Sequence, residues 1–264
     1  MDFSSPKIMG IVNVTPDSFS DGTLEQVTSY HSVMSSWSKD KLRVTSLIQK
    51  GAEIIDIGGE STGPDSKDVS LEEEMERVKP VVDWVGTQNF ASLPIFSIDT
   101  YKADVADYAL SHGFAIVNDV TALRGDLGMI EVLMKHQPYV ILMYSKDSTP
   151  RTTREDVQYD DVIGAIRGFL AVRIDKLLHA GFPRDRILID PGMGMFVSAD
   201  PKYSFEIVDR LDELKALGYP ICVGPSRKSF LGGELKNRDA RSWEVARQAI
   251  QNGASIVRMH TIMR

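Results

Sequence analysis

The chain has 264 residues, 42% of them hydrophobic and 25% charged, a balance typical of a globular protein with a sizeable core. A formal net charge of −7 argues against nucleic acid or a membrane surface as a general partner, although it allows a local basic pocket. Cys222 is the one cysteine, so an internal disulfide is excluded. Together with a start (Met1 to Lys7) that lacks a secretory signal and apolar runs too short to cross a bilayer, this predicts a cytoplasmic protein.

Short segments rich in Val and Ile alternate along the chain with longer segments of helical periodicity. The short segments predict eight buried strands, at Ile8–Val12, Glu53–Ile57, Leu93–Ile98, Phe114–Val117, Tyr139–Met143, Arg186–Ile189, Ile221–Val223 and Ser255–Met259. The longer segments predict helices at Leu71–Val85, Asp104–His112, Leu127–His136, Val162–Ala180, Tyr203–Leu217 and Ser242–Asn252. The first of these helices begins with a capping-box pattern, in which Ser70 precedes Glu73.

Eight strands that alternate with helices predict a parallel sheet, and the number eight favours a (β/α)8 TIM barrel over an open doubly wound sheet. We expect a single domain over residues 1–264, because no linker or low-complexity segment interrupts the pattern. The sequence ends at Arg264, shortly after the eighth strand, so the eighth helix of a complete barrel is absent from it. Two explanations stay open: a truncated chain, or a barrel that is open at this seam.

Every predicted strand ends in polar or charged residues, whereas the strands begin after plain turn residues such as Gly51 and Gly253. The strand ends carry, in chain order, Asn13, Gly58–Thr62, Asp99, Asn118 with Asp119, Tyr144 with Ser145, Asp190, Ser226–Lys228, and Arg258 with His260. Barrel enzymes build their active sites at the carboxyl ends of the strands. This asymmetry therefore predicts an enzyme.

The strand-end groups fall into two chemical sets. The first set combines carboxylates, an amide and a cation, and it suits a flat heterocycle with several ring N–H and carbonyl groups: Asp99, Asn118, Asp190 and Lys228. The second set combines cations with an amide, and it suits a phosphate or pyrophosphate: Asn13, Arg258 and His260. Taken singly, a strand-end Asp or Asn is as often a turn former or a helix cap. Asp56, inside the second strand, is expected to be a structural buried carboxylate.

Seven segments in order resemble signatures of the dihydropteroate synthase family, and the resemblance runs over nearly the whole chain. They read MGIVNVTPDSFSDG from Met9, GAEIIDIGGEST from Gly51, SIDTYKADVA from Ser97, IVNDV from Ile116, LIDPGMG from Leu188, GPSRKSFLG from Gly224 and VRMH from Val257. Several of these segments are long and specific. The family resemblance implies the condensation of 6-hydroxymethyl-7,8-dihydropterin pyrophosphate with p-aminobenzoate, which yields 7,8-dihydropteroate and pyrophosphate.

The resemblance also implies roles for individual residues. The pterin ring would be held by Asp99, Asn118, Asp190 and Lys228, with Met143 beside it. The pyrophosphate would be held by Asn13, Arg258 and His260, with Mg2+ joining Asn13. The p-aminobenzoate site and its closing loops would involve Phe19, Asp21, Ser61, Thr62, Met195 and Ser229. Pyrophosphate would leave first, and the arylamine would attack the resulting pterin cation. A homodimer is a family-level expectation.

Three positions depart from the family pattern. Gly63 stands where the family usually has Arg, Tyr144 where it usually has His, and Met195 where many members have Phe. The departures concern the p-aminobenzoate side and predict an altered sulfonamide response. The lost charge at position 63 is either missing or supplied elsewhere, for example by Lys67, Lys146 or Arg151.

Two other functions stay open on the sequence. A methyltetrahydrofolate:corrinoid methyltransferase would share the pterin-binding set, but it needs neither the SRKSFLG segment that starts at Ser226 nor a pyrophosphate cluster. A non-catalytic pterin-binding relative could have lost turnover together with the cation at position 63 and the eighth helix.

Overall fold

A computed structural model describes residues 1–15, 36–88 and 94–263. Its eight strands form one parallel sheet in the order β6-β5-β4-β3-β2-β1-β8-β7. The strands are β1 (Lys7–Asn13), β2 (Ile54–Gly58), β3 (Ile95–Asp99), β4 (Ile116–Asp119), β5 (Tyr139–Met143), β6 (Ile187–Asp190), β7 (Cys222–Val223) and β8 (Ile256–Met259). The predicted TIM barrel with alternating strands and helices is therefore confirmed.

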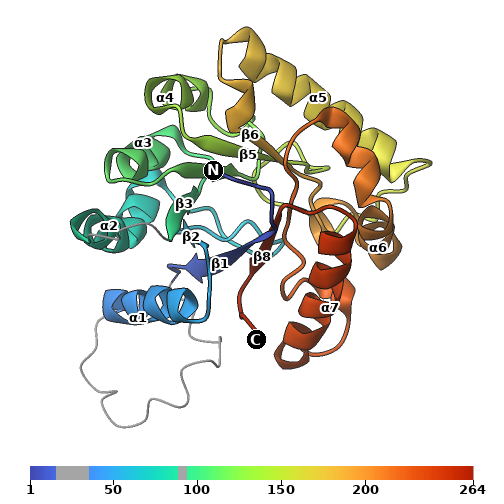
Figure 1. Cartoon of the computed structure of the whole chain (residues 1–264), viewed down its shortest axis with the longest axis horizontal. Helices are drawn as coiled ribbons and strands as arrows, with labels where there is room; N and C mark the ends of the chain where they lie inside the picture. The colour runs from blue at the N-terminus through green and yellow to red at the C-terminus, as the bar shows by residue number, and fades with distance from the viewer. Residues whose placement is uncertain (16–35, 89–93, 264) are drawn as a thin grey trace.

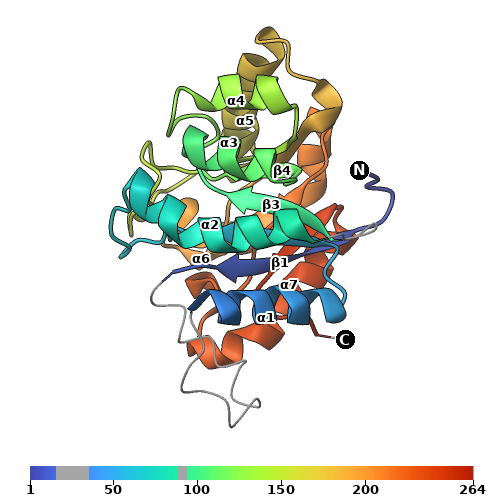
Figure 2. The same cartoon turned by 90° about the vertical axis from the view of Figure 1, so that its left-hand side faces the viewer.

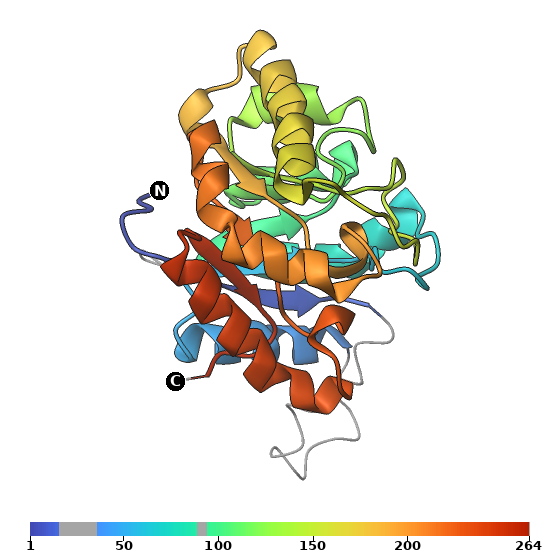
Figure 3. The same cartoon turned by 90° about the vertical axis from the view of Figure 1, so that its right-hand side faces the viewer.

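The helices form a ring outside the strands, which Figure 1 shows along the barrel and Figures 2 and 3 show from two sides. The α-helices are α1 (Ser36–Gln49), α2 (Leu71–Thr87), α3 (Ala103–Ser111), α4 (Met129–His136), α5 (Val162–His179), α6 (Pro201–Asp209) and α7 (Arg238–Gln251). Short 3-10 helices are η2 (Arg184–Arg186), η3 (Gly194–Phe196), η4 (Leu211–Leu217), η5 (Ser229–Leu231) and η6 (Leu235–Asn237).

The barrel is closed at the seam between its first and last strands. β1 pairs with β8 from Lys7 opposite Ile256 to Gly10 opposite Met259, so the suggestion of an opening at this seam is wrong. The weakest junction lies instead between β6 and β7. There a single bridge joins Ile189 to Ile221, next to a 3.0 Å hydrogen bond from Ile189 N to Pro220 O.

The residues after β8 occupy the gap in the helix ring between α7 and α1, where Figures 1 and 3 place the end of the chain. Ile262 is 7% exposed and belongs to the main hydrophobic core. The Trp243 indole of α7 donates a 2.8 Å hydrogen bond to Thr261 O and fixes this segment. No helix follows β8 in the part of the chain that the structure describes.

The barrel interior changes from apolar to polar along the strands. One layer inside the barrel consists of Met9, Ile54, Ile116, Ile141, Leu188, Cys222 and Ile256. Because side chains alternate along a strand, the residues two positions later face the same interior. On five of these strands they are Asp56, Asn118, Met143, Asp190 and Arg258. The polar side chains are thus carried at the carboxyl ends of the strands, above an apolar floor.

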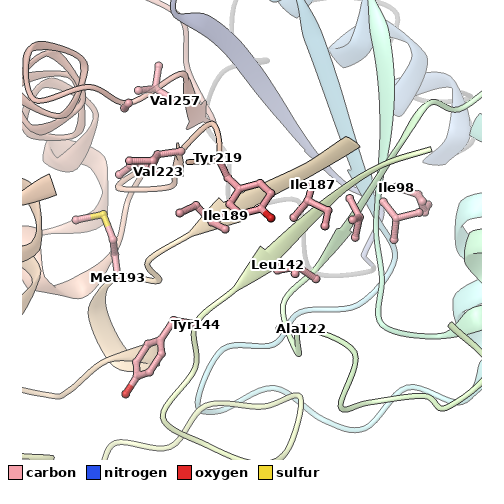
Figure 4. Packing of buried hydrophobic residues seen from close by; sticks show 14 of the residues in the cluster. Ile98, Ala122, Leu142, Tyr144, Ile187, Ile189, Met193, Tyr219, Val223 and Val257 are labelled. Carbon is pink, nitrogen blue, oxygen red and sulfur yellow. The ribbon is translucent and has the colours of Figure 1, made fainter. Parts of the chain in front are cut away.

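The outer faces of the strands are apolar and pack against the helices. Residues between those of the inner layers, including Ile98, Leu142, Ile189, Val223 and Val257, belong to the main core, part of which Figure 4 shows. Gly10 allows α1 to approach β1 closely, since a Cβ atom at this position would lie 3.0 Å from Leu47 Cδ1. This packing fixes the strands from outside and leaves the interior free for polar groups.

Candidate active site

Arg258 joins two carboxylates at the barrel mouth, those of Asp56 inside β2 and Asp99 at the end of β3. Its Nε donates a 2.5 Å hydrogen bond to Asp56 Oδ2, and its Nη2 contacts Asp99 Oδ2. Asn118 Nδ2 donates to the same Asp56 oxygen at 3.1 Å. Asp56 has no exposed surface, and it holds the Arg258 guanidinium and the Asn118 amide from inside the barrel. The prediction that Asp56 is a buried carboxylate is therefore confirmed, whereas a structural role for it stays a prediction.

The pKa values of this pair reflect burial and mutual attraction. Burial raises the pKa of Asp99 to about 7, against the opposing effect of the Arg258 cation, and Asp56 adds to the rise. For Arg258, burial favours loss of the proton, but the carboxylates of Asp56 and Asp99 outweigh it and raise the pKa. The guanidinium therefore stays charged, whereas Asp99 titrates near neutral pH.

Asp190, at the end of β6, and Lys228, after β7, are the next two charged residues of the barrel mouth. Asp190 Oδ1 accepts a 2.7 Å hydrogen bond from Gly192 N, and Lys228 Nζ donates one of 3.1 Å to Met193 O. Burial raises the pKa of Asp190, and burial lowers the pKa of Lys228 to about 8 while Asp190 opposes the drop.

The charged residues Asp99, Asp190, Lys228 and Arg258 all lie at the mouth of the barrel, a region called the pocket below, where their charges act on one another. Arg258 lowers the pKa of Asp190, and Asp99 raises the pKa of Lys228. The structure thus brings Asp99, Asn118, Asp190 and Lys228 to one place, as the sequence predicts. It also places Arg258 among them, although its charge and its strand predicted a separate anion-binding set.

The remaining members of that anion-binding set lie at neighbouring strand ends. Asn13 ends β1 opposite Gly58 and is half-buried. His260 is held by Ser226, whose Oγ accepts the His260 backbone N–H at 3.0 Å and lies 2.9 Å from Nδ1. Arg227 points toward α7 and forms a bidentate ion pair with Asp239, from Nε to Oδ1 at 2.7 Å and from Nη2 to Oδ2 at 3.0 Å.

Two of the residues expected around p-aminobenzoate are linked by the β5–α5 loop. Thr62 O accepts a 3.2 Å hydrogen bond from Thr152 N, and Met195 O accepts one of 2.6 Å from Thr152 Oγ1. Ser61 and Ser229 are exposed at the rim. Met143 is buried at the end of β5, opposite Asp190 in the sheet. Phe19 and Asp21 lie outside the described residues.

Tyr144, one of the departures from the family pattern, belongs to the core outside the barrel. Its hydroxyl lies 2.9 Å from that of Tyr159, and its ring packs edge-on against Phe169. Figure 4 shows Tyr144 on this apolar side together with Met193. We therefore expect an exchange at position 144 to change the packing against α5.

Several residues that shape the rim carry no clear signal in the sequence. Phe196 follows Met195 directly, and its ring centroid lies 4.7 Å from Lys228 Nζ, in cation–π contact. Lys102 Nζ bridges Glu60 and Glu74 at 2.5 Å each, and Arg151 contacts Glu60 from the other side. The sequence predicts Glu60 as part of a strand end, but it does not predict the partners of Glu60, because they lie far from it along the chain.

The family resemblance implies one protein ligand for Mg2+, the side chain of Asn13. Among residues 1–15, 36–88 and 94–263 there is no group of three or more His, Cys, Asp or Glu side chains that could hold a metal ion. The described residues also contain no helix long and apolar enough to cross a membrane.

Comparison with known proteins places these features in a family. A family model described as "Pterin binding enzyme" matches residues 9–260. A dihydropteroate synthase from Synechocystis sp. is 38% identical over 97% of this chain and 85% of its own length. The structure is similar to that of Xanthomonas albilineans dihydropteroate synthase with 4-aminobenzoic acid, with a TM-score of 0.86, 34% identity and coverage of 99% and 90% of the two chains. The same enzyme in complex with 7,8-dihydropteroate gives a TM-score of 0.83, 32% identity and coverage of 99% and 90%.

Proposed function

The chain belongs to the dihydropteroate synthase family of pterin-binding enzymes. We propose that its barrel mouth performs the condensation of a pterin pyrophosphate with p-aminobenzoate, as follows. The substrates are 6-hydroxymethyl-7,8-dihydropterin pyrophosphate and p-aminobenzoate, and the products are 7,8-dihydropteroate and pyrophosphate. The observation that carries the proposal is the cluster at the barrel mouth in which Arg258 pairs with Asp56 and Asp99, and Asn118 donates to Asp56.

The pterin ring lies on the floor of this pocket. Asp99 and Asp190 accept ring N–H groups, Asn118 offers an amide to the ring edge, and Lys228 donates to a ring acceptor. Met143 packs beside the ring. Support comes from the register of the strands, because Asp99 lies opposite Asn118 and Met143 opposite Asp190. The polar groups are therefore carried side by side on adjacent strand ends.

The pyrophosphate lies toward β1 and β8, near Asn13, Arg258 and His260. Asp56 and Asp99 hold Arg258 in place, so its guanidinium is oriented before substrate arrives. Asn13 supplies a neutral oxygen, and this sparse donor set fits an Mg2+ ion that takes its other ligands from pyrophosphate and water. Bound there, Mg2+ would neutralise charge on the leaving group. We expect turnover to stop in excess chelator and to return with added Mg2+.

The p-aminobenzoate site lies at the rim between the loops after β2 and β6, with Ser61, Thr62, Met195 and Ser229. Phe19 and Asp21 complete it in this proposal. The bond between the pterin methylene carbon and the pyrophosphate oxygen breaks first, and its electron pair leaves with pyrophosphate. The arylamine nitrogen then attacks the methylene carbon and loses a proton. Arg258 stabilises the departing charge, and the loops exclude water that would otherwise trap the cation.

The test is product analysis with both substrates and Mg2+. We expect equal amounts of 7,8-dihydropteroate and pyrophosphate. Tight pterin binding without product would indicate a non-catalytic relative. Methyl transfer from methyltetrahydrofolate to a corrinoid, without dihydropteroate formation, would indicate the methyltransferase. Either result would contradict the proposed function.

We also propose that the protein is cytoplasmic and acts as a homodimer. Cys222, the one cysteine, is free and buried in the barrel, in accord with a reducing compartment. Mass measurement in solution tests the dimer. An altered response to sulfonamides stays a prediction, tested by inhibition of the condensation.

A further inference from the structure

Thr152 is a buried residue of the β5–α5 loop that contacts two other loops at once. It is 2% exposed, although it lies in a segment whose neighbours are largely at the surface. Its backbone N–H donates to Thr62 O at 3.2 Å, and its hydroxyl donates to Met195 O at 2.6 Å. One residue therefore links the loop after β2 to the loop after β6.

The Thr152 side chain is itself held by a charged pair in its own loop. Asp147 Oδ2 lies 2.9 Å from Thr152 Oγ1 and 2.6 Å from Lys146 Nζ, and Lys146 Nζ lies 3.3 Å from the same hydroxyl. The Lys146 backbone N–H also donates to Phe196 O at 2.8 Å. The Thr152 hydroxyl thus has two acceptors within reach, Met195 O at 2.6 Å and Asp147 Oδ2 at 2.9 Å, and the Lys146 ammonium as a donor. The β5–α5 loop binds the loop after β6 at two successive carbonyls, those of Met195 and Phe196.

Arg151, the residue before Thr152, fixes the loop after β2 at its far end. It donates a 2.6 Å hydrogen bond to Lys67 O and forms ion pairs with Glu60 and Asp68. Glu60 is in turn bound by Lys102 at 2.5 Å. Both ends of the segment around Ser61 and Thr62 are therefore tied to the β5–α5 loop.

We propose that Thr152 is a positioning residue that sets the spacing between Thr62 and Met195, and thereby the width of the slot that receives the arylamine substrate. The inference rests on the proposed function, which places p-aminobenzoate between these two residues. Thr152 holds each of them by a backbone carbonyl, so a substitution leaves their side chains unchanged. A shift of about 1 Å in such a site can cost about a hundredfold in rate.

The test uses Thr152→Val, which keeps the shape and the backbone N–H but removes the hydroxyl. We expect the KM for p-aminobenzoate to rise about tenfold, while the KM for the pterin pyrophosphate changes less than about twofold. Thr152→Ser restores the hydroxyl and should recover most of the affinity. If Thr152→Val does not fold, Thr152→Cys replaces it, because a thiol is a weak donor.

The matched control is Thr87→Val, at the end of α2. The exposed Thr87 hydroxyl also donates to a backbone carbonyl, that of Trp84 at 2.8 Å, so this variant loses the same kind of contact within α2 and leaves the β5–α5 loop unchanged. We expect unchanged kinetics. Equal effects of both variants, equal rises in both KM values, or an unchanged p-aminobenzoate KM in Thr152→Val would overturn the inference while the enzyme remains a synthase. A wild-type protein that forms no dihydropteroate would overturn the proposed function and this inference with it.

Discussion

Asp99 and Lys228 are half-buried residues of the barrel mouth, and their surroundings move the pKa values of both toward neutrality. Burial removes water from each charged group, so the pKa of the carboxyl rises to about 7 and the pKa of the ammonium falls to about 8. Both groups are predominantly charged at the same time only between these values. Because the proposed pterin contacts need an ionised Asp99 and a protonated Lys228, the chemistry of the site depends on this narrow window.

We predict a bell-shaped pH profile of kcat/KM for the pterin pyrophosphate. As pH falls below about 7, Asp99 gains a proton and loses its acceptor for a ring N–H; as pH rises above about 8, Lys228 loses its charge. Each limb should fall about tenfold per pH unit. Steady-state kinetics over roughly two pH units on either side of this window check the profile.

Lys228→Arg separates the two limbs, because an arginine stays charged over this whole range. In this variant kcat/KM should no longer fall above about pH 8, whereas the fall below about pH 7 should remain, even if the maximal rate is lower. An alkaline limb at the same pH in this variant would show that Lys228 is not the group responsible.

Element by element, much of the fold is predictable from periodicity. The patterns identify all eight strands, and β5 at its observed bounds, because buried Val- and Ile-rich runs are distinctive. Helix α1 is not among the predicted helices, because its sequence SWSKDKLRVTSLIQ is mostly polar and has only a narrow apolar face, with Val44 and Leu47. The predicted helix Tyr203–Leu217 is divided into α6 and η4, because Arg210 leaves helical geometry.

The strand-end residues of the site are also predictable, but their partners are not. Register and alternation place Asp99, Asn118 and Asp190 inside the barrel mouth. The Asp56–Arg258 pair spans 202 residues, and the contact of Thr152 with Met195 joins two loops. Such contacts depend on barrel closure and leave no periodic trace in the sequence.

The loop after β2 yields a prediction for Gly63→Arg. A Cβ atom at this half-buried position would meet only Ser61 Oγ, at 3.6 Å, so the loop has room for a side chain. Arg151 and Lys146 do not supply a spare charge, because they pair with Glu60 and Asp147. An added guanidinium would form charge-assisted hydrogen bonds to a substrate anion, worth about 1.5–3 kcal/mol each. We therefore expect kcat/KM for p-aminobenzoate to rise about tenfold or more.

Gly168→Arg is the control for this substitution. Gly168 lies on the exposed side of α5, where a Cβ atom would meet no other atom within 4 Å, and the variant adds the same charge far from the loop after β2. It should leave kcat/KM unchanged. If Gly63→Arg gives no gain either, the charge is supplied from elsewhere, with Lys67 as the remaining candidate, and our account of this loop is wrong.

For the molecule as a whole, the segment after β8 extends the hydrophobic core beside α7. Ile262 is buried in the core, so Ile262→Ala should lower the free energy of unfolding by about 2–4 kcal/mol. Met263, the next residue, is 45% exposed, and Met263→Ala should change this free energy by less than about 0.5 kcal/mol. Urea unfolding measures both. Equal stability of the two variants would mean that this segment does not complete the core.

The two ends of the barrel are expected to differ in kind: one carries the chemistry, and the other contributes only stability. Strand β6 offers a matched pair for this claim, because Asp190 ends it inside the pocket and Asp185 precedes it on the exposed 3-10 helix η2. Asp190→Asn keeps an oxygen for the Gly192 N–H, so the fold should survive. Asp185→Asn removes the same charge at the opposite end.

The most direct test is kcat/KM for the condensation of pterin pyrophosphate with p-aminobenzoate, measured for both variants beside the wild type. Loss of two charge-assisted hydrogen bonds, each worth about 1.5–3 kcal/mol, predicts a drop of about a hundredfold or more in Asp190→Asn. Asp185→Asn should stay within about twofold of the wild type, in line with an exposed site away from the chemistry. Full activity in Asp190→Asn, or an equal loss in both variants, would contradict a synthase whose active site is the carboxyl-end rim of this barrel.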